Sequence, residues 1–366
     1  MISSLLPRFR YMDQLQRFLQ ITRNTTKSDL IQFNNQYLSK HKIKPITYQI
    51  PGFYNYIKQE IIQGDIESLN KASTHYFSKE GKLIRPMLNL LYANHIEKNS
   101  QNTEQQKIWA AVIEILHVAS LVHDDILDAS ETRRGIPSAH VIFGKHRATF
   151  SANYLIGRAG RKISELDDIR MFQIYSQIMD NLTNGEYLQA MKQKSFHNFE
   201  ITLQNYMIKT YYKTAALIAN SLQGVCQLTN IKDEVCEKSF NIGLHLGVAF
   251  QIIDDVLDYT SNTEQLGKAS LNDLKSGVLT GPVLFELFNQ QKINSPEYQL
   301  MNSVLLGNSK QYETVNSIVL AGEGIEQSKF LAYQHTQEAL KILSSINTQP
   351  DQDLISLIFM FINRNK

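Results

Sequence analysis

The sequence predicts an all-helical protein that forms one large domain, and two observations support this prediction. No proline occurs between Pro137 and Pro282, and within that stretch apolar residues recur mostly at steps of three and four, the spacing of an amphipathic helix. Sustained alternation of apolar and polar residues, which would indicate strands, is scarce. The chain has 366 residues, of which 43% are hydrophobic, so it can bury a substantial core.

Turn-forming residues divide the helical pattern into segments, and none of the breaks has the composition of an interdomain linker. The predicted breaks lie at residues 42–52, 99–106, 135–137, 261–267 and 294–296. The strongly apolar run near the C-terminus, from Leu354 to Ile362, is about half as long as the roughly 20 residues that span a bilayer. We therefore expect helices packed against one another and no membrane-spanning segment.

The first 27 residues are basic and carry apolar residues near helical spacing. They contain one acidic residue, Asp13, and five basic residues, which are Arg8, Arg10, Arg17, Arg23 and Lys27. This composition predicts a mitochondrial targeting segment over residues 1–27 and one domain over residues 28–366. We expect the protein in the mitochondrial matrix, with association to the inner membrane as an option. An ordinary basic amphipathic helix is the alternative interpretation.

Charge and cysteine content exclude several classes of function. The formal net charge is only +2, and no basic stripe interleaved with aromatic residues is present, so nucleic acid is not an expected partner. The two cysteines, Cys226 and Cys236, lack the Cys-x-x-Cys spacing of a metal site, so we expect neither a zinc site nor a disulfide framework.

Two motifs of the form Asp-Asp-x-x-Asp carry the functional signal. We call Asp124-Asp125-Ile126-Leu127-Asp128 the first comb and Asp254-Asp255-Val256-Leu257-Asp258 the second comb. In a helix, the first and fifth residues of each comb share one face, and the second is displaced by about 100°. The residues before each comb are apolar nearly all round, which predicts buried helices. These residues are Ile113, Ile115, Leu116, Val118, Ala119, Leu121 and Val122, and Leu244, Leu246, Val248, Ala249, Phe250, Ile252 and Ile253.

Gathering like charges on buried helices is unfavourable unless cations compensate them. Carboxylates without histidine or cysteine favour a hard ion, and Mg²⁺ binds one or two carboxylates together with substrate phosphates. One comb alone would more simply be a solvated acidic helix end. The matched pair instead predicts a Mg²⁺ site that binds a diphosphate.

Basic residues lie close to the combs along the chain. A single basic pair is more often solvated surface than a binding site, so their significance rests on position. A diphosphate bridged by Mg²⁺ needs further cations, and a metal-free diphosphate needs a cationic pocket of its own. The basic residues in question are Lys82, Arg85, Arg133, Arg134, Lys213 and Lys268.

The order of these elements resembles that of the trans-isoprenyl diphosphate synthases, especially their long-chain polyprenyl branch. The resemblance runs from Gly81 to Lys366 and includes both combs. The other matching motifs are Glu114-x-x-His117-x-Ala119-Ser120, Arg133-Arg134-Gly135-x-Pro137-Ser138-x-His140, Gly185-Glu186, Lys213-Thr214-Ala215, Phe250-Gln251 and Gly324-Ile325-Glu326. The resemblance implies a single large helical bundle of the isoprenoid synthase type around a deep central cavity, with residues 28–366 as a trans-prenyltransferase domain.

The resemblance also implies a role for each matching residue. Asp124, Asp128, Asp254 and Asp258 would hold Mg²⁺, and Asp125, Asp255 and Lys213 would complete the catalytic set. Arg133, Lys213, Thr214, Gln251 and Lys268 would bind the allylic diphosphate. Lys82, Arg85, His117 and Arg134 would bind isopentenyl diphosphate without metal. Without the resemblance, His117 would be interpreted as a core histidine.

The implied reaction removes diphosphate from the allylic substrate, and the isopentenyl double bond attacks the resulting carbocation. Product length would depend on Ala119 and Ser120, one turn before the first comb. Both are small, whereas short-chain members of the family usually carry an aromatic residue there, so we expect long products. By analogy, the product would supply the side chain of a respiratory quinone.

Two positions depart from the family pattern. Asn153 stands where the family usually has aspartate, and Ala269 replaces the proline that usually follows Gly267-Lys268. An alternative function is therefore a synthase-like subunit with weak or no catalysis, acting as a structural partner in a mitochondrial membrane complex. A terpene cyclase, which releases a hydrocarbon, is a second alternative. We expect a homodimer or a hetero-oligomer with a related subunit, and peripheral membrane association as an option.

Overall fold

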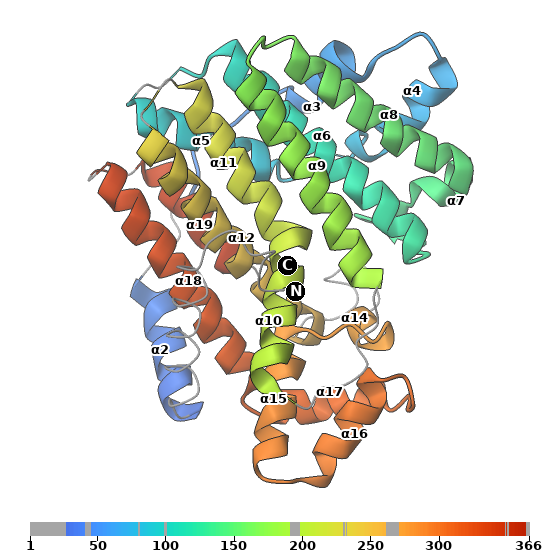
Figure 1. Cartoon of the computed structure of the whole chain (residues 1–366), viewed down its shortest axis with the longest axis vertical. Helices are drawn as coiled ribbons and strands as arrows, with labels where there is room; N and C mark the ends of the chain where they lie inside the picture. The colour runs from blue at the N-terminus through green and yellow to red at the C-terminus, as the bar shows by residue number, and fades with distance from the viewer. Residues whose placement is uncertain are drawn as a thin grey trace.

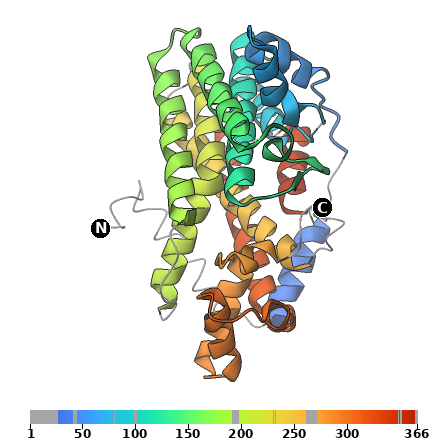
Figure 2. The ribbon, with the colours of Figure 1, turned by 90° about the vertical axis from the view of Figure 1, so that its right-hand side faces the viewer.

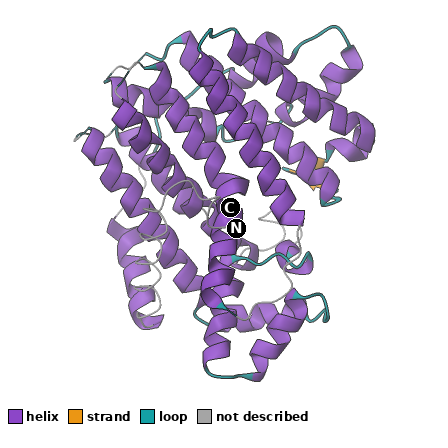
Figure 3. Cartoon of the chain, in the orientation of Figure 1, coloured by secondary structure: helices purple, strands orange, loops and turns teal. Residues whose placement is uncertain are grey.

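The computed structural model describes residues 27–40, 45–79, 81–98, 101–190, 198–229, 231, 233–260, 271–347, 349 and 351–363. Nearly all regular structure in this part of the chain is helical, which confirms the predicted fold class (Figure 3). The elements are α2 (Lys27–Lys40), α3 (Phe53–Tyr56), the π-helical turn η1 (Ile57–Ile62), α4 (Glu67–Thr74), the 3₁₀ turn η2 (His75–Phe77), α5 (Ile84–Glu97), α6 (Glu104–Leu127), β1 (Thr132–Arg133), β2 (Ile136–Pro137), α7 (Ala139–Phe143), α8 (Lys145–Ser164), α9 (Ile169–Ala190), α10 (Phe199–Thr210), the π-helical turn η3 (Tyr211–Ala215), α11 (Ala216–Leu228), α12 (Asp233–Thr260), α14 (Asn272–Lys275), α15 (Gly281–Lys292), α16 (Pro296–Leu305), α17 (Tyr312–Ala321), α18 (Gly324–Ile346) and α19 (Gln352–Ile362).

Local sequence signals explain where several helices begin and end. α6 starts after a capping box, in which the Thr103 hydroxyl accepts from the Gln106 amide at 3.2 Å and the Gln106 side chain accepts from the Thr103 amide at 2.9 Å. α16 begins with Pro296, whose fixed φ suits the first helical position. These starts agree with the predicted breaks at 99–106 and 294–296. The predicted break at 261–267 lies outside the described residues.

A small antiparallel hairpin follows the first comb and was not predicted. β1 pairs with β2 so that Thr132 faces Pro137 and Arg133 faces Ile136. The two residues of the turn, Arg134 and Gly135, both have positive φ, at 52° and 74°. This geometry matches a two-residue hairpin turn that follows strand twist. The hairpin thereby sets where the two arginines point.

The bundle is organised around the two comb-bearing helices (Figure 1). α12 packs against α11 and α18, and α6 packs against α5 and α8. Figure 2 shows the same helices from the side, with α9 and α10 forming one outer face of the molecule. The predicted burial of α6 and α12 is confirmed, because their apolar residues belong to two large hydrophobic clusters.

Glycine allows α12 to approach its neighbours closely. A Cβ added at Gly247 would lie 2.4 Å from the Cα of Ala215, and one at Gly243 would lie 2.6 Å from the Cα of Ala219. Because these distances leave no room for a side chain, α12 contacts η3 and α11 backbone to backbone. This contact fixes α12 against η3, which carries Lys213.

The terminal and cysteine predictions have different outcomes. Residues 1–26 of the predicted targeting segment 1–27 lie outside the described residues, and α2 begins at Lys27. Within the described residues, α12 alone has the length and composition to cross a membrane, but 72% of that window is buried in the protein, as in a core helix.

Cys226 and Cys236 are free thiols, yet their Sγ atoms lie 2.6 Å apart.

Candidate active site

The first comb occupies the last turn of α6, and its three aspartates differ in burial. Asp125 is 1% exposed, Asp124 is partly buried, and Asp128 is exposed at the position that ends the helix. The predicted burial of the helix thus extends into the comb as far as Asp125 and does not include Asp128. The first and fifth carboxylates remain accessible to a ligand.

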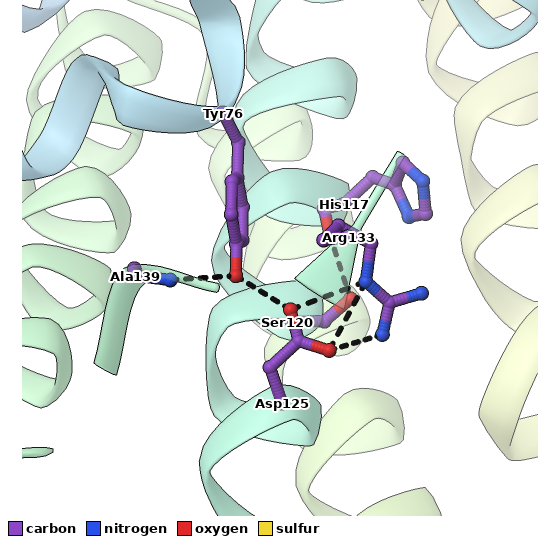
Figure 4. Close-up of polar contacts among 6 residues, drawn as sticks. All are labelled: Tyr76, His117, Ser120, Asp125, Arg133 and Ala139. Carbon is purple, nitrogen blue, oxygen red and sulfur yellow. Dashed lines mark hydrogen bonds and ion pairs between the residues drawn. The ribbon is translucent and has the colours of Figure 1, made fainter. Parts of the chain in front are cut away.

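Asp125 is held by a network of hydrogen bonds (Figure 4). The Tyr76 hydroxyl donates to its Oδ2 at 2.5 Å, and the Arg133 Nε donates to Oδ1 and Oδ2 at 3.0 and 3.1 Å. A further ion pair joins the terminal nitrogen of Arg133 to Asp125. The Ala139 amide in turn donates to the Tyr76 hydroxyl at 3.0 Å. Asp125 thus links α6 to η2, β1 and α7.

The second comb has a similar arrangement within α12. Asp255 is 4% exposed, while Asp254 and Asp258 are partly buried. Asp255 accepts from the Tyr206 hydroxyl at 2.8 Å and from the Gly281 amide at 3.1 Å. Burial and the nearby charge of Asp273 raise the pKa of Asp255 to about 6.

Lys213 lies between the two combs. Burial alone would lower its pKa, but the carboxylates of Asp273, Asp124, Asp255 and Asp128 outweigh this effect and raise it. The Lys213 side chain is exposed to solvent, although many protein atoms lie near it. It projects from η3, a π-helical turn, and such turns are frequent at functional sites. The ammonium group is therefore charged and shared by carboxylates of both combs.

Glu186 is an acidic neighbour of the first comb that the site predictions did not include. Burial, together with a hydrogen bond to Asp124 and the charges of Asp124 and Asp128, raises its pKa to about 8. The preceding Gly185 explains the approach of α9. A Cβ there would lie 3.1 Å from the Tyr212 carbonyl carbon and 3.2 Å from the Lys213 amide nitrogen.

The donor atoms at the combs fit a magnesium ion bound together with a diphosphate. Among the described residues, no three carboxylate, imidazole or thiol groups are already gathered tightly enough to chelate an ion. Mg²⁺ does not need such a cage, since it commonly uses one or two carboxylates plus phosphate oxygens and water. Burial and the charges of Asp124 and Asp128 keep Glu186 protonated at neutral pH, which shows an excess of negative charge that a divalent cation would compensate.

A second group, rich in arginine, surrounds His117 on α6. Burial, followed by the charges of Arg85, Arg134 and Arg133, lowers the pKa of His117 well below its usual value. The imidazole is therefore neutral and able to donate one hydrogen bond. Figure 4 shows it on the same side of α6 as the Arg133 guanidinium. This concentration of positive charge suits an anion that brings no metal.

Two neighbours balance and orient this arginine group. Glu114 is 3% exposed and accepts from the Tyr54 hydroxyl at 3.2 Å. Burial raises the pKa of Glu114, and the charges of Arg85 and Arg134 act against that rise. The Arg85 guanidinium also lies 5.7 Å from the centre of the Phe250 ring, which ties α5 to α12.

The remaining predicted site residues differ in their positions relative to the combs. The Thr214 hydroxyl donates to the Gln251 side chain at 2.5 Å, and Gln251 donates to Asp255 at 2.9 Å, so both belong to the second comb's surroundings. Lys82 is exposed before α5 and makes no hydrogen bond or ion pair within the described part of the chain. Lys268 and Ala269 lie outside the described residues.

The two proposed chain-length residues lie on α6 and differ in environment. Ala119 is 1% exposed and packs within the core around α6. Ser120 is partly buried, and its hydroxyl donates to the His117 carbonyl at 2.8 Å. Asn153 forms a side-chain hydrogen bond with His123, the residue before the first comb. The departure at Asn153 therefore lies next to the site.

Comparison with known proteins assigns the chain to a family. The family model described as "Polyprenyl synthetase" matches residues 66–320. A prenyl transferase of Cyanophora paradoxa is 36% identical over 294 residues, covering 80% of this chain and 88% of that protein. The human all trans-polyprenyl-diphosphate synthase PDSS1 is 34% identical over 322 residues, covering 87% of this chain and 75% of that protein.

Solved structures agree with this assignment. The heptaprenyl diphosphate synthase of Staphylococcus aureus has a TM-score of 0.78 and 28% identity, covering 89% of this chain and 100% of that chain.

Relatives by sequence also include the chloroplastic solanesyl diphosphate synthase 2 of Arabidopsis thaliana, at 30% identity over 82% of this chain and 75% of that protein. The chain belongs to the polyprenyl synthetase family and is a prenyltransferase related to long-chain trans-prenyltransferases of the quinone side-chain type.

Proposed function

We propose that this enzyme is a Mg²⁺-dependent long-chain trans-polyprenyl diphosphate synthase, which condenses isopentenyl diphosphate with an allylic diphosphate. The observation that carries the proposal is the presence of two groups of residues, each suited to binding a diphosphate in a different way. Lys213 is surrounded by carboxylates of both combs, as a metal-bridged diphosphate requires. His117 is surrounded by arginines, as a metal-free diphosphate requires.

The residues of the first group would promote departure of the allylic diphosphate. Bound magnesium would supply a Lewis acid that neutralises charge on the leaving oxygens, held by Asp124, Asp128, Asp254 and Asp258. The Lys213 ammonium would donate to the same diphosphate as the carbon–oxygen bond breaks and negative charge grows.

The second group would hold isopentenyl diphosphate ready for attack. Arg85 and Arg134 would bind its diphosphate, and neutral His117 would donate a hydrogen bond without adding charge. The isopentenyl double bond would then attack the allylic carbocation, and loss of a proton would restore a double bond in the lengthened chain. Apolar surroundings would keep water away from the cation.

Compartment, partner and product use follow by analogy. The basic N-terminal residues favour the mitochondrial matrix, and the human relative is named as a polyprenyl diphosphate synthase. We propose that the product becomes the side chain of a respiratory quinone. A dimer, formed with a second copy or with a related subunit, and peripheral contact with the inner membrane are proposed with it. Large apolar residues exposed on α8 and α9, among them Phe150 and Tyr187, support a contact surface there.

One assay separates the proposed enzyme from its alternatives. Purified protein is incubated with Mg²⁺, farnesyl diphosphate and labelled isopentenyl diphosphate, alone and with a related catalytic subunit. We expect a long prenyl diphosphate whose formation stops when the metal is chelated. A hydrocarbon product would instead identify a cyclase. Absence of extension under both conditions would identify a structural subunit, the function that Asn153 beside His123 would favour.

A further inference from the structure

Each comb is attached to the rest of the bundle through its middle aspartate, a tyrosine and the first amide of a later helix. In the first comb, the buried Tyr76 hydroxyl donates to Asp125, and the Ala139 amide donates to that hydroxyl (Figure 4). Ala139 is the first residue of α7. In the second comb, the Tyr206 hydroxyl and the Gly281 amide both donate to Oδ2 of Asp255. Gly281 is the first residue of α15.

Each network joins a middle aspartate, a tyrosine and the first amide of a later helix. The two tyrosines are each 4% exposed, so their hydroxyls are withdrawn from bulk water. Each tyrosine also precedes its aspartate by 49 residues. A buried carboxylate is stable only when donors satisfy it, and these donors come from elements outside the comb's own helix. The middle aspartates are thus committed to protein contacts.

Fixing the second residue of a comb also fixes the direction of the first and fifth. All three project from the same helix end, with the second about 100° from the first. Once the second carboxylate is held from outside, the helix end cannot rotate about its axis or unwind. This matters most for the first comb, because α6 ends at Leu127 and terminal helical turns fray readily.

We propose that Tyr76 and Tyr206 are positioning residues, which hold Asp125 and Asp255 so that the first and fifth aspartates of each comb face the metal and the diphosphate. This inference rests on the proposed function, because it assigns the metal to those aspartates. The two networks are not equivalent. Asp125 keeps the Arg133 guanidinium when Tyr76 is altered, whereas Asp255 keeps only the neutral Gln251 side chain and the Gly281 amide among its hydrogen-bond donors named above.

The test removes one hydroxyl at a time and measures metal binding directly. Tyr76→Phe and Tyr206→Phe are compared with Tyr175→Phe, because Tyr175 is also buried and its hydroxyl donates to the Ile156 carbonyl at 2.9 Å, away from both combs. Calorimetric titration with Mg²⁺ is carried out in the presence of inorganic diphosphate, at a temperature below the unfolding transition of every variant. The same proteins are assayed for the Mg²⁺ concentration that gives half-maximal extension.

We expect Mg²⁺ affinity to fall about tenfold to hundredfold in Tyr76→Phe and Tyr206→Phe, as is usual when a group that orients a metal ligand is lost. The larger loss is expected for Tyr206→Phe, and Tyr175→Phe should bind Mg²⁺ like the parent. The KM for isopentenyl diphosphate should change little, which a general loosening of the fold would not produce.

Two outcomes would overturn the inference. One is unchanged Mg²⁺ affinity in both comb variants, and the other is an equal loss in Tyr175→Phe. Failure of the proposed function is distinguishable from either, because a protein that binds Mg²⁺ and diphosphate but extends no prenyl chain would still report whether the tyrosines position the combs.

Discussion

The Glu186 side chain on α9 is hydrogen-bonded to Asp124 on α6, and its pKa is raised to about 8. At pH 7 Glu186 is therefore protonated, because it is buried and because Asp124 and Asp128 disfavour a further negative charge beside them. A cation bound at Asp124 would reverse that effect.

We predict that Mg²⁺ binding with diphosphate releases a proton from Glu186 at pH 7. Mg²⁺ affinity should accordingly rise as pH increases toward 8, since Glu186 loses its proton there without help from the metal. Calorimetry in two buffers of different ionisation enthalpy measures the released proton. Glu186→Gln should remove this release, while Glu165→Gln, at an exposed position on α8's C-terminal side, should not. Equal proton release in all three proteins would contradict the prediction.

Arg134 provides a test of the metal-free pocket. Arg134→Gln should raise the KM for isopentenyl diphosphate about tenfold to hundredfold, because a charge-assisted hydrogen bond to a diphosphate is lost. The KM for the allylic substrate should change much less. Arg161→Gln is the matched control, since Arg161 is exposed and forms a surface ion pair with Glu165 at 3.6 Å. Similar increases in both KM values would show that the two groups of diphosphate-binding residues are not separate.

Product length should respond to bulk one turn before the first comb. Ser120→Phe and Ala119→Phe are both expected to shorten the product, because an aromatic ring would block the path of the growing chain. Ala119 is 1% exposed, so its replacement should also destabilise the fold, whereas the partly buried Ser120 should tolerate the change better. Chromatography of the dephosphorylated products, alongside thermal unfolding, separates the two effects. An unchanged product in Ser120→Phe would rule out this path.

Two buried histidines predict how stability depends on pH. The Nδ1 atoms of His245 on α12 and His335 on α18 lie 2.8 Å apart, so one ring donates and the other accepts. Burial lowers the pKa of His245 to about 4, and burial with the charge of His245 lowers the pKa of His335 well below its usual value. The unfolded chain binds these protons near pH 6.5 and the folded chain does not, so the free energy of unfolding should fall as pH drops from about 6.5 to 4.

Denaturant titrations at several pH values measure this slope. His335→Asn, whose amide can still donate to His245, should flatten it, and His146→Asn on the exposed side of α8 should leave it unchanged. The same slope in the parent and in His335→Asn would assign the acid sensitivity to other groups.

The free thiols of Cys226 and Cys236 predict a response to oxidants. Their Sγ atoms lie 2.6 Å apart at the end of α11 and the start of α12. Hydrogen peroxide should convert the two thiols to a disulfide, with two electrons and two protons passing to the peroxide to form water. Intact-mass measurement should show the loss of two hydrogen atoms, reversed by dithiothreitol. Cys226→Ser should not show it, and a parent protein that keeps both hydrogens would contradict the prediction.

The sequence was sufficient for the combs and their helices because those features are local. Apolar residues on all sides of the segments before Asp124 and Asp254 predict buried helices, and the aspartate spacing predicts which carboxylates share a face. His117 lies seven residues before Asp124, and this spacing of two helical turns predicts that the two residues share a face. The sequence predicts a break at residues 135–137, but the hairpin there depends on positive φ at both Arg134 and Gly135.

Contacts between distant segments could not be predicted in this way. Gly185-Glu186 matches a motif of the family, but nothing in the sequence indicates that Glu186 meets Asp124; the glycine indicates only a close approach by some other backbone. Tyr76 and Tyr206 likewise carry no local signal, since a buried tyrosine needs only some hydrogen-bond partner. Asp273 and Lys209, which influence the charges around the second comb, were missed for the same reason.

The π-helical turn from Tyr211 to Ala215 has a consequence for how the enzyme can vary. A π turn contains one residue more than the α-helical turn it replaces, so deletion of a single residue there would let α10 and α11 join as one regular helix. The bundle would keep its packing on one side of the deletion, but Lys213 would be turned by about 100° away from the combs. Deletion of a single residue in this turn would therefore leave a chain that can still fold but cannot carry out the reaction.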